Sequence, residues 1–236
     1  MTLSNMQANP MDFVTSRNYK SKKHPPYTFE EAKHFLTLMK EDKSFDYLYT
    51  PVLLAFLFAA TREEVTALLD TDLHDENYSI TIDKAYIVTK RGKVTTKQKT
   101  EHRNRIVYTD KFVFDEIRRY KKEHGLGMYP YLCCTKTGAQ LQPGNLTARF
   151  SDFVKKHKLK YLTFHKIRNT FGNMCKRAGI DPDTAFRMFG HANYKTTVEH
   201  YNSADDYLIR KASATLSSKL FENENEKPLA KNDFSM

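Results

Sequence analysis

Apolar residues recur along most of the chain at the spacing of helices that bury one face. Thr28 and Glu31 have the spacing of a capping box, which predicts a helix from there to about Met39. Two more helices are predicted over roughly 46–60, which includes the apolar run 51–60, and over about 61–69. Later stretches with the same spacing are 113–125, 145–154, 164–179 and 181–190, with further turns within 192–213.

The spacing changes in the middle of the chain. Three short segments rich in β-branched residues, 78–82, 85–90 and 104–109, predict a small three-stranded antiparallel sheet. Between the last two lies "RGKVTTKQKTEH", which we expect to form the basic tip of a hairpin. The predicted fold is therefore mainly α (α+β), a helical core with this sheet at one edge.

Charge and cysteine content narrow the function classes. The 236 residues include 38 Lys and Arg against 28 Asp and Glu, a net charge of +10, which favours a polyanionic partner. Nucleic acid is the first candidate and an anionic membrane the second, while a solvated basic surface explains the charge equally well. The three cysteines have neither metal-site nor disulfide spacing, which predicts a reducing intracellular compartment. The run 51–60 is too short to span a bilayer, and the first residues lack the layout of a signal peptide.

The stretch "FHKIRNTF" (164–171) places two polar residues beside an apolar helix face. Phe164, Ile167 and Phe171 fall on one stripe, and His165 and Arg168 share its margin. A half-buried guanidinium is costly without an anionic partner, and no acid follows on this turn. Either a distant carboxylate or an anion from outside the chain must therefore meet Arg168.

Two further residues complete an ordered set. His191, within "FGHANYKTTVEHY", follows Arg168 by 23 residues, and Tyr201 follows His191 by 10. This order and spacing resemble those of the tyrosine recombinases, also called phage integrases, over roughly residues 27–213. The flanking stretches "RNTF", "AGIDPDTAFRMFGHA" and "TTVEHY" resemble that family as well.

The resemblance implies a site-specific recombinase that breaks and rejoins duplex DNA to integrate or excise a phage or mobile element. Tyr201 would attack phosphorus and form a 3′-phosphotyrosyl link, which frees a 5′-hydroxyl. His165, Arg168 and His191 would hold the phosphate oxygens, since cations stabilise the charge of the transition state. The link conserves the energy of the broken bond, so no ATP, metal or other cofactor is expected.

Two positions of the family's site have alternatives in this sequence. The lysine that protonates the leaving 5′-oxygen is expected on a hairpin, where Lys99 and Lys97 compete, and we predict Lys99. The first arginine of the family stands three residues before a glutamate. If Glu64 is that glutamate, the position falls on Thr61, whereas a turn shorter by one residue would place Arg62 there. We predict Arg62; Thr61 in this position would indicate a catalytically impaired DNA-binding relative.

The resemblance also predicts domains and partners. Residues 1–26 would be a basic linker or arm from an absent core-binding domain, 27–213 the catalytic domain, and 214–236 a polar tail. The expected partner is a double-stranded DNA recombination site, bound by a tetramer of a protein that is monomeric when free. Residues 207–221 could be exchanged between neighbours or dock on their own chain. The expected location is the cytoplasm of a bacterium, with a bacterial or phage gene.

Overall fold

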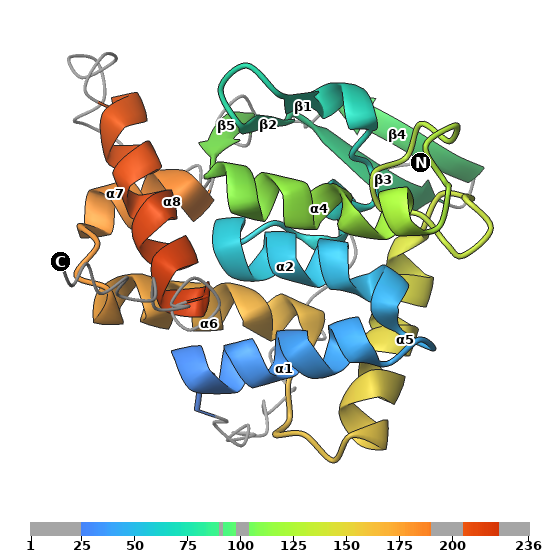
Figure 1. Ribbon diagram of the computed structural model, residues 1–236, viewed down its shortest axis with the longest axis horizontal. Coiled ribbons are helices and arrows are strands. Elements are labelled where there is room, and N and C mark those ends of the chain that lie inside the picture. The colour runs from blue at the N-terminus through green and yellow to red at the C-terminus, as the bar shows by residue number, and fades with distance from the viewer. Residues whose placement is uncertain (1–24, 90–91, 98–103, 190–204, 222–236) are drawn as a thin grey trace, which may run out of the picture.

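Helices stacked around α2 (Tyr49–Phe58) form the core of the computed structural model, which describes residues 25–89, 92–97, 104–189 and 205–221. α1 (Phe29–Glu41), α4 (Lys111–Glu123) and α6 (Phe164–Arg177) all contact α2 (Figure 1). Every residue of α2 is buried, as expected of a helix that is apolar on all sides. The predicted core helix is thus confirmed, and a short 3₁₀ turn, η2 (Asp46–Leu48), precedes it.

The remaining helices cover this core. They are α3 (Arg62–Val65), α5 (Pro143–Lys156), α7 (Pro182–Phe189) and α8 (Asp205–Phe221). The capping box of Thr28 and Glu31 is present at the start of α1, and Asp181 accepts a hydrogen bond from the Thr184 amide at the start of α7. α3 is much shorter than the predicted helix over 61–69, since its C-cap is already Thr66 and Leu69 forms a β-bridge with Tyr131. A second 3₁₀ turn, η3 (Asp70–Asp72), follows.

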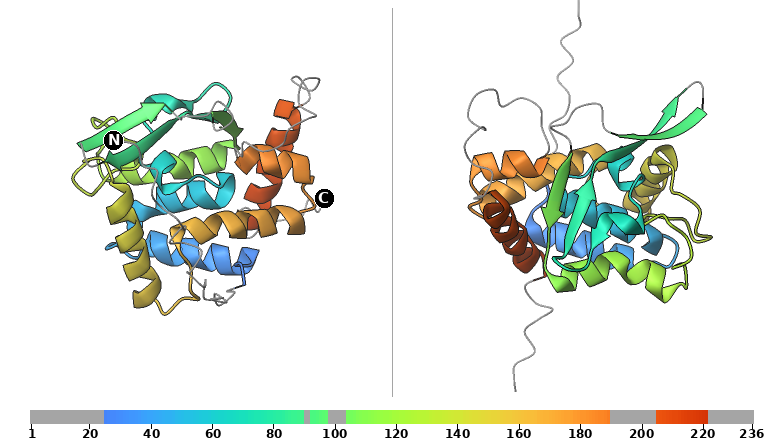
Figure 2. Two further views of the ribbon diagram at one scale, coloured as in Figure 1. Left: turned by 180° about the vertical axis from the view of Figure 1, so that it is seen from behind. Right: turned by 90° about the horizontal axis from the view of Figure 1, so that it is seen from above.

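The strands form two sheets instead of the single sheet that was predicted. β1 (Leu73–His74), β2 (Ser79–Ile82) and β5 (Arg105–Tyr108) make a three-stranded antiparallel sheet. β3 (Lys84–Thr89) pairs with β4 (Gly92–Lys97), a segment predicted to be a hairpin tip. This two-stranded hairpin extends beyond the body of the helices (Figure 2). The prediction of small antiparallel strands was correct, but their pairing was wrong.

α8 packs against its own chain. It contacts α1, α2, α7 and β5, and Leu216, Leu220 and Phe221 are buried. The Phe221 ring meets the Phe112 ring edge-on, with centroids 5.1 Å apart. The predicted boundary at residue 214 therefore falls inside a packed helix. Of the two arrangements considered for residues 207–221, the chain adopts docking in cis.

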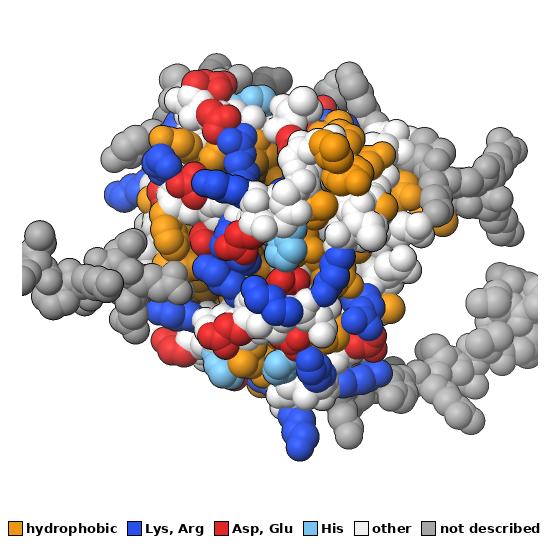
Figure 3. Space-filling model, turned by 45° about the vertical axis from the view of Figure 1, so that its right-hand side comes forward, with side chains coloured by type: hydrophobic (Ala, Val, Ile, Leu, Met, Phe, Trp, Pro, Cys, Tyr) orange, Lys and Arg blue, Asp and Glu red, His pale blue; other side chains and the backbone are white. Residues whose placement is uncertain are grey.

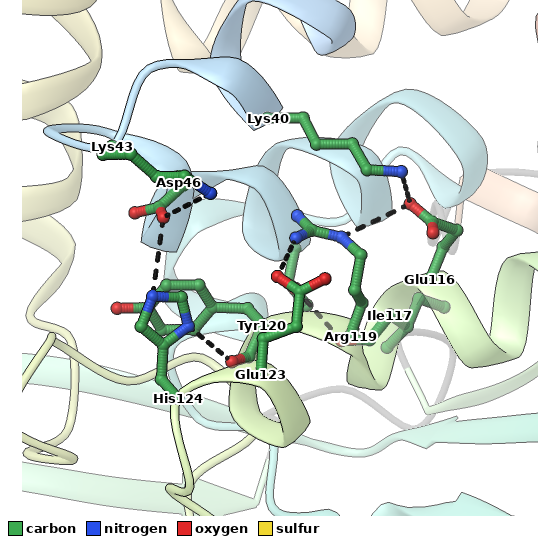
Figure 4. Close-up of polar contacts among 10 residues, drawn as sticks. Lys40, Lys43, Asp46, Glu116, Ile117, Arg119, Tyr120, Glu123 and His124 are labelled. Atoms are coloured by element: carbon green, nitrogen blue, oxygen red, sulfur yellow. Dashed lines mark hydrogen bonds and ion pairs between the residues drawn. The ribbon is translucent and has the colours of Figure 1, made fainter.

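Ion pairs fasten α4 to α1 and η2 (Figure 4). Lys40 on α1 pairs with Glu116 at 2.8 Å. His124, at the end of α4, lies 3.6 Å from the carboxylate of Asp46, which is buried. The His124 ring also stacks on Tyr120, with centroids 4.2 Å apart. The contacts of Lys40 and Asp46 thus hold α4 against α1 and η2.

The three cysteines, Cys133, Cys134 and Cys175, are buried free thiols. Burial raises the pKa of Cys175 to about 12. Among the helices of the described part of the chain, none has both the length and the apolar character needed to cross a bilayer.

Candidate active site

A tight turn between α2 and α3 lies at the centre of the site. α2 ends at Ala59, whose φ of 51° is left-handed, a conformation that glycine adopts more easily than alanine. Thr61 then caps α3: its side chain accepts a hydrogen bond from the Glu64 amide, and Glu64 Oε2 accepts one from the Thr61 amide at 2.9 Å. The turn thus presents the carbonyls of residues 58 and 59 and places Thr61 at a helix N-cap.

Arg168 joins this turn to two other helices. It projects from the first half of α6, which Thr163 caps. Its Nη1 donates to the Ala59 carbonyl and its Nη2 donates to the Phe189 carbonyl at 3.0 Å. Ala59 is the C-cap of α2 and Phe189 the last residue of α7, so the guanidinium lies at the C-terminal ends of two helices. The negative ends of both helix dipoles favour a cation at this point.

The Phe189 ring completes the seat of Arg168. The guanidinium carbon lies 5.4 Å from the centre of this ring. Phe171 meets the same ring edge-on, with centroids 4.8 Å apart. Gly172 lets the ring approach α6, because a Cβ at this position would lie 3.2 Å from the Phe189 ring. Phe189 therefore positions Arg168 with its carbonyl and with its ring.

His165 lies in the first turn of α6, one turn before Arg168, and its side chain is exposed. This agrees with the predicted placement of the two residues on neighbouring positions of one helix margin. The structure thus places Arg168 against the turn that precedes Thr61 and leaves His165 exposed one turn earlier on α6.

Arg62 is directed elsewhere. Its side chain is 46% exposed, and its Nε donates to Glu63 at 2.6 Å. Its Nη1 donates to the Thr147 hydroxyl of α5 at 3.1 Å. The acceptors of Arg62 therefore belong to α3 and α5, whereas those of Arg168 belong to the ends of α2 and α7. Arg62 and Arg168 were predicted to hold one phosphate together. In the structure these hydrogen bonds of the two guanidinium groups lead to different elements.

A buried ion pair beneath the turn is absent from the sequence predictions. Arg105, the first residue of β5, donates from Nη1 to Glu64 Oε1 at 3.1 Å and from Nη2 to Glu64 Oε2 at 3.0 Å. Their side chains are 7% and 4% exposed. Arg105 also donates to the Phe58 carbonyl at 3.4 Å. The capping-box pattern of Thr61 and Glu64 was visible in the sequence, but nothing there indicated a partner on β5.

Three predicted site residues, Lys99, His191 and Tyr201, lie outside the described residues. Lys97, the alternative to Lys99, is the last residue of β4 and lies opposite Lys84 in the hairpin. Among the residues that the structure describes, no three His, Cys, Asp or Glu side chains gather in a way that could hold a metal ion.

One face of the molecule carries charges of both signs. On the side formed by α4 and α5, Lys and Arg side chains alternate with Asp and Glu (Figure 3). Several of them are paired, as in Arg119 with Glu123 at 2.5 Å and Lys156 with Asp42 at 2.6 Å. Since charges on this side are largely balanced by neighbours, it resembles an ordinary solvated face more than a binding surface for a polyanion.

The profile of the phage integrase family matches residues 28–207, most of the chain and nearly all of the predicted catalytic domain. The chain belongs to the phage integrase family. The resemblance drawn from the ordered His, Arg, His and Tyr residues is thereby confirmed.

Known relatives of this integrase-family chain come from transposons. It is 24% identical over 215 residues to the transposase of transposon Tn916 from Enterococcus faecalis and to that of Tn1545 from Streptococcus pneumoniae. Each match covers 84% of this chain and 53% of the relative. The chain thus spans about half the length of the relatives it matches.

Solved structures show the same fold. The integrase of transposon Tn1549, solved in complex with transposon right end DNA, superposes with a TM-score of 0.68 at 22% identity, over 80% of this chain and 65% of that one. The XerA recombinase superposes with a TM-score of 0.57 at 16% identity, over 89% of this chain and 67% of that one. The predicted class, a helical recombinase catalytic domain with small antiparallel sheets, is confirmed.

Proposed function

We propose that this chain is the catalytic domain of a site-specific recombinase that breaks and rejoins duplex DNA at the ends of a mobile element. The observation that carries the proposal is that Arg168 donates hydrogen bonds to the carbonyls of Ala59 and Phe189 at the C-terminal ends of two helices, in a chain of the phage integrase family. The two carbonyls orient this guanidinium, and its planar fork of donors suits the oxygens of a phosphate.

The proposed reaction has one covalent step for each strand. The Tyr201 oxygen attacks the phosphorus, the new O–P bond forms, and the bond from phosphorus to the 5′-oxygen breaks. Lys99 gives a proton to the leaving 5′-oxygen, and the phenol releases its own proton to water. Arg168, with His165 and His191, holds the non-bridging oxygens as charge develops. Attack by a 5′-hydroxyl on the phosphotyrosyl link reverses these bonds and joins a strand, which requires neither ATP nor a metal ion.

Covalent capture tests this proposal. A pool of nicked duplexes with randomised sequence is incubated with the full chain, and adducts are resolved on a denaturing gel and sequenced. We expect an adduct that is lost in Tyr201→Phe and kept in the matched control Tyr194→Phe. An adduct that persists in Tyr201→Phe would show that another residue is the nucleophile.

A second candidate, a DNA-binding relative with impaired chemistry, is favoured by the first arginine. Thr61 and Glu64 form the capping box, which supports assigning the family's arginine position to Thr61, and Arg62 contacts Glu63 and Thr147 instead. This candidate predicts salt-dependent binding to duplex DNA without any adduct. Recovery of the adduct in Thr61→Arg, with none in the parent, would select it over the first.

We further propose that the protein is a monomer when free and assembles as a tetramer on a DNA recombination site. Residues 207–221, whose helix α8 packs on its own chain here, are the candidates for a segment exchanged between protomers on DNA. Sedimentation of DNA complexes formed by the full chain and by a variant lacking 207–236 tests this. Equal stoichiometry of the two complexes would exclude the exchange.

A further inference from the structure

We propose that Arg105 is a positioning residue for strand cleavage. Through Glu64 it holds the α2–α3 turn in the conformation on which Arg168 is seated. The inference rests on the proposed function for its catalytic consequence, and on the contacts of Arg105, Glu64 and the turn for its structural part.

The ion pair between Arg105 and Glu64 is costly to bury. Arg105 and Glu64 form a bidentate contact with side chains 7% and 4% exposed. Removing two charges from water is expensive, and an apolar pair of similar volume often stabilises a fold as well or better. The pair is therefore poorly explained by stability alone. What an apolar pair could not reproduce is the fixed orientation of the Glu64 carboxylate.

The Glu64 carboxylate connects Arg105 to the N-cap of α3. Glu64 Oε2 accepts from Arg105 Nη2 at 3.0 Å and from the Thr61 amide at 2.9 Å. The Thr61 hydroxyl in turn accepts from the Glu64 amide at 3.2 Å. Because both oxygens of the carboxylate meet the planar guanidinium, Glu64 is confined to the rotamer that caps Thr61. Thr61, the alternative to Arg62 for the family's first arginine, is thus fixed from beneath by Arg105.

Arg105 and Arg168 donate to neighbouring carbonyl oxygens of the same turn. Arg105 Nη2 donates to the Phe58 carbonyl, and Arg168 Nη1 donates to the carbonyl of the next residue, Ala59. One guanidinium comes from β5 and the other from α6, and the turn lies between them. A shift of the turn would therefore displace the acceptor on which Arg168 depends, and an error of about 1 Å can cost about a hundredfold in rate.

Two variants separate positioning from stability. In the double variant Arg105→Met/Glu64→Leu, an apolar pair of similar size replaces the ion pair, and we expect the fold to persist. In Arg105→Lys the charge remains but the bidentate contact is lost. The matched control is Arg118→Gln/Asp75→Asn, which removes a bidentate pair from the exposed surface, with distances of 2.6 and 3.1 Å.

The first measurement does not require catalysis. Amide hydrogen exchange at Thr61, followed by NMR on the full chain, reports the hydrogen bond to Glu64. We expect exchange at least about tenfold faster in the double variant and an intermediate rate in Arg105→Lys, with no change in the control. Because the double variant also removes the Glu64 acceptor, Arg105→Lys decides: unchanged exchange at Thr61 in folded Arg105→Lys would overturn the inference.

The second measurement is the rate of adduct formation at saturating nicked DNA. We expect at least about a tenfold loss in the double variant, with DNA affinity within about threefold of the parent. A folded double variant with the parent's rate would overturn the positioning role even if the proposed function holds. If the parent itself forms no adduct, the proposed function fails instead, and exchange at Thr61 still decides whether Arg105 holds the turn.

Discussion

Arg105 and Arg168 donate hydrogen bonds to consecutive carbonyl oxygens, those of Phe58 and Ala59, where α2 ends. The two guanidinium groups reach this point from β5 and from α6, which lie far apart in the sequence. Both are placed at the negative end of the dipole of α2. The geometry of the site is therefore set by the short turn after α2, which links the sheet to the helical core.

The conformation of Ala59 gives a direct test of how this turn is held. With a φ of 51°, Ala59 pays a steric penalty that glycine avoids. We expect Ala59→Gly to raise the free energy of unfolding by about 1 kcal/mol, as measured by urea denaturation. The matched control is Ala60→Gly at the next, equally buried residue, which has no positive φ and should lose about 1 kcal/mol. Equal losses in both variants would contradict this account.

Much of the helical core was predictable because its signals are local. The apolar run of α2, the capping box of α1 and the Asp-Pro start of α7 each lie within a few consecutive residues. Strand pairing is not local. The segment 92–97 contains Val94, Thr95 and Thr96, which favour a strand, but its lysines suggested a solvated tip. In the structure this segment pairs with β3, and β5, within 104–109, pairs with β2 instead.

The same distinction between local and long-range signals applies to the residues of the site. The placement of His165 and Arg168 on one helix was predictable because the apolar stripe of α6 is a local signal, and their roles in the site stay predictions. The role of Arg105 was not, since Glu64 lies 41 residues earlier and the pair forms only when β5 packs beside α3. The partner of Arg168 was expected to be an anion, but the structure adds two helix-end carbonyls, and no local pattern reveals such acceptors.

Gly172 tests the packing of Phe189 beside Arg168. Alanine in a helix interior normally adds up to about 1 kcal/mol relative to glycine. At Gly172 the new methyl would lie 3.2 Å from the Phe189 ring, and we expect this crowding to cancel the gain. Gly144→Ala in the first turn of α5, where nothing lies within 4 Å, is the control and should be stabilised. Equal gains in thermal or urea stability would show that the Phe189 ring moves aside freely.

The lowered pKa of the Asp42 carboxyl predicts that the free energy of unfolding depends on pH. Burial opposes ionisation of this carboxyl, but hydrogen bonds from Lys156 and His157 and from the Ser44 amide outweigh it and lower its pKa. A lowered pKa contributes stability that is present above the unfolded pKa of about 4 and is lost as the pH falls through the folded value.

Asp42→Asn should therefore cost about 1–2 kcal/mol of unfolding free energy at pH 7, and the cost should shrink as the pH falls below about 4. Urea denaturation at several pH values measures this difference. Asp152→Asn is the control, because Asp152 is about half exposed in its pair with Arg149 and an exposed pair contributes little. A cost that stays constant down to pH 2 would contradict the lowered pKa of Asp42.

Arg168→Lys tests whether the geometry of the guanidinium matters beyond its charge. A lysine ammonium keeps the positive charge, but it lacks the planar fork that reaches the carbonyls of Ala59 and Phe189 at once. We expect about a hundredfold slower adduct formation at saturating nicked DNA, with the salt dependence of DNA binding unchanged. Arg177→Lys, at the exposed end of the same helix, is the control and should keep the parent's rate. If Arg168→Lys also keeps it, charge alone is sufficient at this position, and the seat formed by the two helix ends has no part in strand cleavage.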